Sequence, residues 1–211
     1  MSDGAAMFRI PLPLIPVFLL VAFVAAGALW HLGDLQSGTG TQTVTTTPAT
    51  QLGGPFSLVD QNGQRRTDAD YRGKYMLVFF GYTYCPDVCP TTLAVMTAAL
   101  DMMGTRAERI VPIFISVDPA RDTPEMLKNY LAAFGPRWVG LTGTPEEVAA
   151  IAKEYRVYYR VNAGEDGNYT VDHSGVVYLM KPDGTYLANY SLANQPDLMA
   201  ADLTRRTIAA R

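Results

Sequence analysis

Cysteine and histidine are both scarce in this chain, which has two of each among its 211 residues. Two cysteines are too few for the disulfide framework that stabilises small secreted domains. The chain also lacks a basic stripe, since 20 Asp and Glu residues outnumber 17 Lys and Arg residues, and this balance argues against nucleic-acid binding. The stability of the protein must therefore come from an apolar core, and its thiol chemistry is confined to Cys85 and Cys89.

Charged residues are absent from residues 10–30, and a segment of this length suits a helix that crosses the hydrocarbon core of a bilayer. We interpret residues 1–32 as a short cytoplasmic N-terminus with a retained transmembrane signal anchor. A cleaved signal peptide is the alternative, because Ala26-Gly27-Ala28 resembles a small-x-small cleavage site. Arg9 precedes the apolar run and the next basic residue is Arg65, so the positive-inside rule places the rest of the chain outside the cytoplasm.

Residues 33–52 are rich in Gly, Thr, Ser and Gln and show no apolar periodicity. This composition is typical of a flexible linker. Residues 53–211 then have the length of one globular domain, about 160 residues. We therefore expect an anchor, a linker and a single folded domain.

Strand and helix signals alternate through residues 53–211. Strands are predicted at 56–59, 75–80, 110–117, 138–141, 176–180 and 185–190, and helices at 90–103, 123–134, 144–155 and 195–210. The order of strand then helix predicts an α/β fold with a parallel core sheet, to which the C-terminal hairpin adds antiparallel strands. Pro112 predicts a start or an irregularity in its strand, and the polar residues 158–169 predict a loop or a loose hairpin.

Cys85 and Cys89 follow the buried strand 75–80 directly and precede a helix. Ligands of such sheets lie beyond the carboxyl ends of the parallel strands. A helix N-terminus stabilises thiolate, which is both the nucleophile of thiol exchange and the form that binds metals. The pair can therefore hold a soft metal or cycle between dithiol and disulfide. A purely structural disulfide is a weak alternative, because so short a loop removes little chain entropy.

His173 is the only histidine of the predicted domain, because His31 lies in the N-terminal segment. Two thiolates and one imidazole can form a compact site with three ligands. Soft thiolates select Cu(I) and imidazole also suits copper, whereas a closed structural zinc site needs four ligands. Copper is thus the favoured metal, and Asp172 is a candidate hydrogen-bond partner of the imidazole.

Four stretches together resemble the SCO/SenC family of thioredoxin-like copper proteins, which act in assembly of the copper centre of cytochrome c oxidase. They are Phe-Gly-Tyr-Thr-Tyr-Cys-Pro-Asp-Val-Cys-Pro at 80–90, Ser-Val-Asp-Pro-Ala-Arg-Asp-Thr-Pro at 116–124, Val-Asp-His-Ser-Gly at 171–175 and Lys-Pro-Asp-Gly at 181–184. One departure is visible, since many members carry His where this chain has Tyr84. That position is not one of the three expected ligands.

The resemblance implies a thioredoxin-like fold with a mixed central sheet, and one copper ion, as Cu(I) or Cu(II), bound by Cys85, Cys89 and His173. It implies a metallochaperone that delivers copper to the dinuclear copper centre of cytochrome c oxidase subunit II, with another copper-accepting assembly factor as the alternative partner. It also implies a single-pass anchor in the inner membrane, with the soluble domain in the periplasm. There the cysteines must be kept reduced by a thiol reductant.

Two enzymatic alternatives use the same cysteines. A thiol–disulfide oxidoreductase would reduce the cysteines of the oxidase subunit before metallation, although the spacing here is Cys-x3-Cys and not Cys-x-x-Cys. A thiol peroxidase is less well supported, because the Pro-x3-Thr-x2-Cys pattern of peroxiredoxins is absent. The charged residues Asp118, Arg121 and Asp122 are interpreted mainly as a structural turn, with partner docking as the alternative.

Overall fold

The computed structural model describes residues 52–164, 168–191 and 195–208. Their strands form one seven-stranded sheet in the order β2-β1-β5-β4-β3-β8-β9 and a separate two-stranded sheet, β6-β7. The strands are β1 (Ser57–Asp60), β2 (Arg65–Thr67), β3 (Tyr75–Gly81), β4 (Ile110–Ser116), β5 (Val139–Thr142), β6 (Tyr159–Ala163), β7 (Tyr169–His173), β8 (Val176–Met180) and β9 (Tyr186–Ser191). The helices are α2 (Val88–Met103), α3 (Pro124–Ala132), α4 (Pro145–Glu154) and α5 (Pro196–Ile208), with short 3-10 turns η2 (Asp68–Tyr71) and η3 (Gly104–Arg109).

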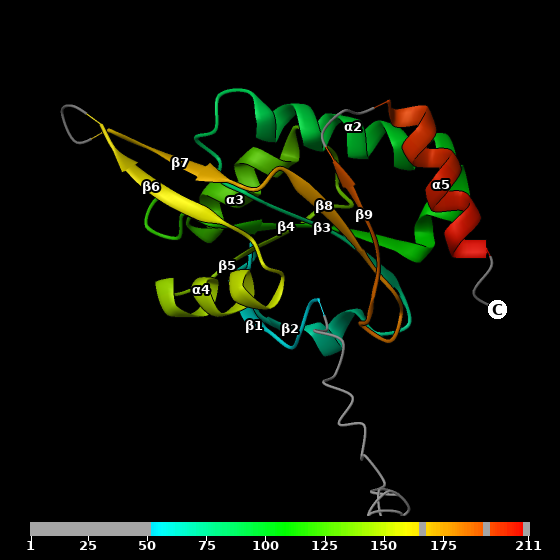
Figure 1. Ribbon diagram of the computed structural model, residues 1–211, viewed down its shortest axis with the longest axis horizontal. Coiled ribbons are helices and arrows are strands. Elements are labelled where there is room, and N and C mark those ends of the chain that lie inside the picture. Colours follow the sequence, from blue (N-terminus) through cyan, green and yellow to red (C-terminus); the bar gives the residue numbers. More distant parts are fainter. Residues whose placement is uncertain (1–51, 165–167, 192–194, 209–211) are drawn as a thin grey trace, which may run out of the picture. The chain divides into compact units, whose positions relative to one another are not determined.

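The large sheet is mixed. Strands β3, β4 and β5 run parallel, whereas β8 pairs antiparallel with β3 and β1 pairs antiparallel with β5. Helices α2 and α3 supply the two crossovers between the parallel strands, and Figure 1 shows α2 and α5 on one side of the sheet with α4 on the other. The predicted α/β fold, with a parallel core and an antiparallel C-terminal hairpin, is therefore confirmed.

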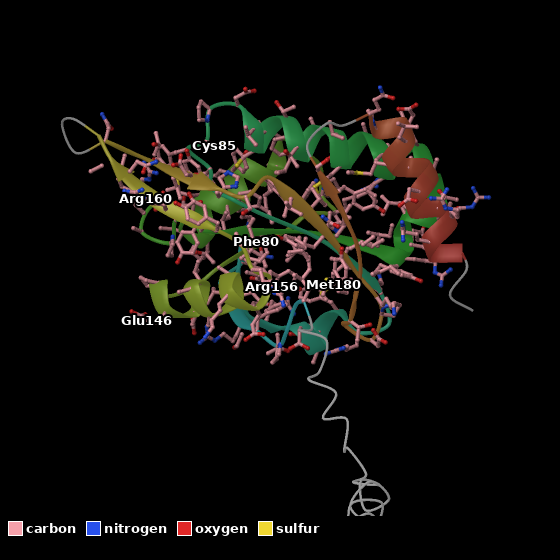
Figure 2. The ribbon with its side chains drawn as sticks, in the orientation of Figure 1. Phe80, Cys85, Glu146, Arg156, Arg160 and Met180 are labelled. Carbon is pink, nitrogen blue, oxygen red and sulfur yellow. The ribbon has the colours of Figure 1, made fainter. Side chains whose placement is uncertain are left out.

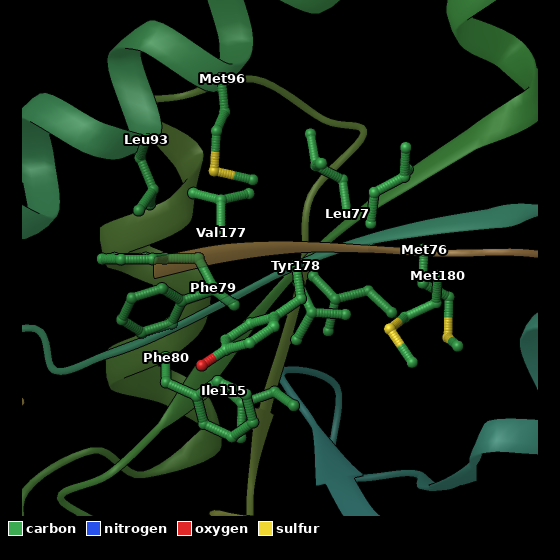
Figure 3. Close-up of a cluster of buried hydrophobic side chains, with 14 of the residues drawn as sticks. Met76, Leu77, Phe79, Phe80, Leu93, Met96, Ile115, Val177, Tyr178 and Met180 are labelled. Carbon is green, nitrogen blue, oxygen red and sulfur yellow. The ribbon is translucent and has the colours of Figure 1, made fainter. Parts of the chain in front are cut away.

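Strand β3 is the centre of the core, since all seven of its residues are buried. Both faces of β3 and its neighbour β8 are covered by buried side chains. Leu93 and Met96 of α2 lie on one side of these strands, and Phe80 and Tyr178 lie on the other (Figure 3). Burial on both faces explains why the sequence of β3 reads as an unbroken apolar run rather than an alternating one.

Pro112 lies inside β4 within an unbroken register, so the prediction of a strand start or an irregularity at this residue is wrong. On one side Pro112 pairs in register with Leu77 of β3. On the other side the pairing with β5 begins only at Ile113, opposite Val139. Pro112 thus lies where β4 has no β5 neighbour, and the missing N–H costs no ladder hydrogen bond on that side.

The segment predicted as a loop or a loose hairpin is a hairpin, formed by β6 and β7. Its register pairs Tyr159 with His173 and Ala163 with Tyr169. His173 is the last residue of β7 and lies three positions before the start of β8. The two strands stand apart from the seven-stranded sheet, and most of their residues are partly or fully exposed, which explains their polar sequence.

The predicted anchor at residues 1–32, and the linker at 33–52 except its last residue, lie outside the described residues. Among the helices that the structure does describe, none is both long and apolar enough to cross a bilayer.

Candidate metal centre

The two cysteines lie where β3 passes into α2. The chain turns tightly after β3, with the backbone N–H of Cys85 donating to the carbonyl oxygen of Tyr82 over 3.2 Å. Helix α2 begins at Val88, two residues earlier than predicted, so Cys89 belongs to its first turn. Figure 2 shows Cys85 between the start of α2 and the β6–β7 hairpin.

A hydrogen bond at the start of α2 links the backbone of Cys89 to the sulfur of Cys85. The backbone N–H of Cys89 donates to Cys85 Sγ over 3.4 Å, so the sulfur receives one of the N–H groups that a helix N-terminus leaves without a partner. Both cysteines are free thiols, but Cys89 is completely buried while Cys85 is half-buried. The site therefore has one inner sulfur and one that solvent or a partner can reach.

His173, at the end of β7, also lies beside the two cysteines. Its Nε2 atom lies 3.3 Å from Cys89 Sγ, and the donor atoms of Cys85, Cys89 and His173 all lie within 4.8 Å of one another. The three residues that the sequence singled out are thus brought together, across 84 positions in the case of Cys89 and His173.

The donor set fits a single soft metal ion. Metal–thiolate and metal–imidazole bonds are about 2.0–2.3 Å long, so three donors around one ion are roughly 3.5–4 Å apart in a trigonal arrangement. The observed spread needs only small side-chain movements to reach this geometry. Two thiolates and an imidazole are also the ligand types that Cu(I) prefers.

The two thiols have opposite acidities. The hydrogen bond from the Cys89 thiol lowers the pKa of Cys85 to about 4, and the backbone N–H groups of Cys89 and Asp87 act in the same direction. The pKa of Cys89 is raised, because its proton is held by the Cys85 sulfur and because burial disfavours a second charge. Loss of a proton is therefore favoured at Cys85 over Cys89.

Two aromatic rings and a carbonyl group fix the imidazole of His173. The rings of Phe79 and Tyr82 meet it edge-on, with centroids 5.9 and 5.8 Å away. Its Nδ1 atom faces the carbonyl oxygen of Ser174 at 3.4 Å, which favours the tautomer whose Nε2 lone pair points towards the sulfurs. Asp172, predicted as the partner of the imidazole, is exposed instead, because adjacent residues of a strand point to opposite faces.

Asp122 organises the turn before Cys85, a role that sequence reasoning did not assign to it. This fully buried carboxylate accepts hydrogen bonds from the backbone N–H and the hydroxyl of Thr83, at 3.0 and 2.6 Å, and from Ser116 Oγ at 2.6 Å. A usable signal existed, since Asp122 follows β4 and the cysteine turn follows β3. The carboxyl ends of adjacent parallel strands meet at one edge of a sheet.

A family model described as SCO1/SenC matches residues 44–207. This chain belongs to the SCO1/SenC family. A human relative, the mitochondrial protein SCO1 homolog, is 46% identical over 155 residues, which are 72% of this chain and 52% of that protein. The chain spans about half the length of this human protein and of related SCO1 proteins from Arabidopsis thaliana and Schizosaccharomyces pombe.

Solved structures support the same fold. The structure of Bradyrhizobium japonicum ScoI with copper bound is 49% identical and superimposes with a TM-score of 0.69, covering 73% of this chain and 98% of that one. BsSco, described with a disulfide switch and as a member of the Sco family of cytochrome c oxidase assembly proteins, is 25% identical with a TM-score of 0.60 and covers 74% and 94%. The thioredoxin-like fold with a mixed sheet is thereby confirmed.

Proposed function

We propose that this protein is a copper metallochaperone of cytochrome c oxidase assembly, which binds one copper ion through Cys85, Cys89 and His173. The observation that carries the proposal is the convergence of these three donor atoms within 4.8 Å. A copper-bound relative that is 49% identical supports the choice of metal, and the assembly role assigned to BsSco supports the pathway.

The acceptor in this proposal is the dinuclear copper centre of cytochrome c oxidase subunit II, and the chaperone is held in the inner membrane by residues 1–32 with its domain in the periplasm. Release follows from the unequal burial of the sulfurs. Cys85 is half-buried, whereas Cys89 is completely buried. An incoming cysteine of the acceptor therefore displaces Cys85 first, and the ion is passed on by stepwise ligand exchange.

A thiol–disulfide oxidoreductase is the second candidate, and one observation favours it. Cys85 is half-buried with a pKa lowered to about 4, whereas the pKa of the buried Cys89 is raised, and this asymmetry suits an attacking and a resolving cysteine. In this role the protein would reduce the cysteines of the same subunit before metallation. Its reaction would need both cysteines but would not need His173.

Copper titration of the reduced 211-residue chain separates the two functions. We expect one equivalent of tightly bound copper, with thiolate-to-copper charge-transfer bands in the Cu(II) form that change in His173→Ala. The matched control is His31→Ala, the other histidine of the sequence, which should leave the bands unchanged. Transfer of the bound copper to the apo copper domain of subunit II would then test delivery.

The opposite result would favour thiol exchange. If the reduced chain takes up no specific copper, but forms a reversible disulfide between Cys85 and Cys89 with undiminished exchange in His173→Ala, the metallochaperone proposal is wrong.

A further inference from the structure

The hairpin that carries His173 is not hydrogen-bonded into the main sheet. Strands β6 and β7 form a two-stranded sheet separate from the main one, and such a unit alone is at best marginally stable in water. Within these strands Val171 is the residue buried in the core, at 4% exposure. The position of His173 therefore depends on contacts from outside the hairpin.

Arg121, in the turn after β4, makes several of these contacts. Its guanidinium carbon lies 3.5 Å from the ring centroid of Tyr169, the first residue of β7. Its Nη1 atom donates to the carbonyl oxygen of Tyr169 over 3.0 Å. Asp118 closes the arrangement, because it accepts hydrogen bonds from Arg121 Nε and from the Tyr169 hydroxyl, the latter at 2.6 Å.

The same guanidinium also contacts the cysteine turn. It lies 4.7 Å from the ring centroid of Tyr84 and 5.7 Å from that of Tyr82, and the Tyr82 ring meets the His173 imidazole edge-on. A planar cation stacks well on aromatic faces and donates hydrogen bonds in its plane at the same time. One residue thus joins the segment that carries the cysteines to the strand that carries the histidine.

We propose that Arg121 is a positioning residue for the metal centre, which fixes β7 against the cysteine turn so that His173 meets the two sulfurs. Tyr169 and His173 lie four residues apart on one strand, so restraint of the first limits the movement of the second. The proposal rests on the proposed copper function for its effect on affinity, but its structural effect exists without metal. It also makes the turn after β4 part of the metal centre and not only a connection.

Substitution of Arg121 tests the proposal in the 211-residue chain. Arg121→Met keeps the aliphatic stem and removes the guanidinium, and Arg121→Lys keeps the charge but loses the planar stack and its fork of donors. The matched control is Arg137→Met, which breaks an ion pair to Asp101. Arg137 lies just before β5, at the end of the parallel strands opposite to the cysteines.

Three measurements are expected to change together in Arg121→Met. Hydrogen exchange of the reduced apo chain should show roughly tenfold or greater loss of amide protection in β7, because a cation–aromatic stack and a charged hydrogen bond are both removed. Competition with a chelator should show copper bound roughly tenfold or more weakly. Electron paramagnetic resonance of the Cu(II) form should lose or broaden the imidazole nitrogen coupling. Arg121→Lys should show the same three losses as Arg121→Met, whereas Arg137→Met should match the wild type in all three measurements.

The opposing outcomes are distinct. If Arg121→Met keeps the β7 protection, the copper affinity within twofold and the nitrogen coupling of the wild type, Arg121 is not a positioning residue. If the wild type itself binds no copper, the proposed function fails, while hydrogen exchange still decides whether Arg121 fixes the hairpin. If Arg121→Met does not fold, Tyr169→Leu removes the same stack from the other side, and unchanged β7 protection and nitrogen coupling in that variant would overturn the proposal.

Discussion

Gly81 is the position where one added methyl group should disturb the metal centre most directly. An ideal Cβ at this residue would lie 2.7 Å from Cys89 Sγ, 2.9 Å from Cε2 of Phe114 and 3.1 Å from Cε1 of Phe79. All three neighbours are completely buried, and protein interiors leave little space into which they could move. To reach an ordinary contact of 3.4 Å, the sulfur must shift by about 0.7 Å.

Two losses follow in Gly81→Ala. Overpacking of this kind costs about 1–3 kcal/mol of unfolding free energy, measurable by urea denaturation of the reduced apo chain. Because His173 Nε2 is only 3.3 Å from the displaced sulfur, we also expect copper affinity to fall roughly ten- to a hundredfold, measurable by chelator competition. The control is Gly54→Ala, whose added Cβ meets Oε2 of Glu154 at 2.7 Å, the end of an exposed and flexible side chain. Copper affinity of Gly81→Ala within twofold of the wild type would refute this reasoning.

Two further predictions concern single side chains. Alkylation of Cys85 by iodoacetamide in the reduced apo chain should proceed at nearly the same rate from pH 6 to pH 8, because its pKa is lowered to about 4; an ordinary thiol would react roughly 75-fold faster at the higher pH, and such a rise at Cys85 would show that its thiolate is not stabilised. Thr144→Ala should cost about 1 kcal/mol in urea denaturation, since Thr144 and Glu147 cap α4 reciprocally, whereas Thr144→Ser should retain most of the stability; equal losses in both would contradict the capping argument.

The three residues of the candidate metal centre could be singled out from sequence because few residues of the chain can bind a soft metal. Both cysteines lie on one turn that follows an apolar strand, and the domain contains a single histidine, so scarcity alone selected His173. The strands of the main sheet were equally visible, because burial on both faces leaves continuous apolar runs such as that of β3. Local sequence is sufficient wherever one residue type or one apolar pattern carries the structure.

The surroundings of the metal centre could not be predicted in the same way. The β6–β7 hairpin has few buried residues, so its polar sequence did not distinguish strands from a loop. The contact of Arg121 with Tyr169 spans 48 positions, and no local pattern announces it. The charged turn of Asp118, Arg121 and Asp122 was interpreted mainly as structural, but the sequence did not show that its side chains contact the hairpin and the cysteine turn.

Asp122 offers a test of how that turn is held. In Asp122→Ala the backbone N–H of Thr83 and the hydroxyl of Ser116 both lose their acceptor, so we expect a loss of about 2–4 kcal/mol in unfolding free energy. Asp122→Asn can keep one oxygen for both of these donors and present its amide group to the Thr83 hydroxyl, which is free to rotate. Its cost should therefore stay within about 1 kcal/mol.

The pH dependence separates the effect of charge from that of hydrogen bonding. Burial raises the pKa of Asp122 above its ordinary value, against the opposing hydrogen bonds from Ser116 and Thr83. Above about pH 4 the unfolded chain therefore releases a proton that the folded chain still holds, and the stability that this residue contributes falls as pH rises through that window. The amide introduced by Asp122→Asn does not titrate. The unfolding free energy of this variant, measured by urea denaturation, should therefore rise relative to that of the wild type as pH increases. If the unfolding free energy of Asp122→Asn instead falls relative to the wild type as pH rises, the ionised carboxylate holds Thr83 and, through it, the turn of Cys85.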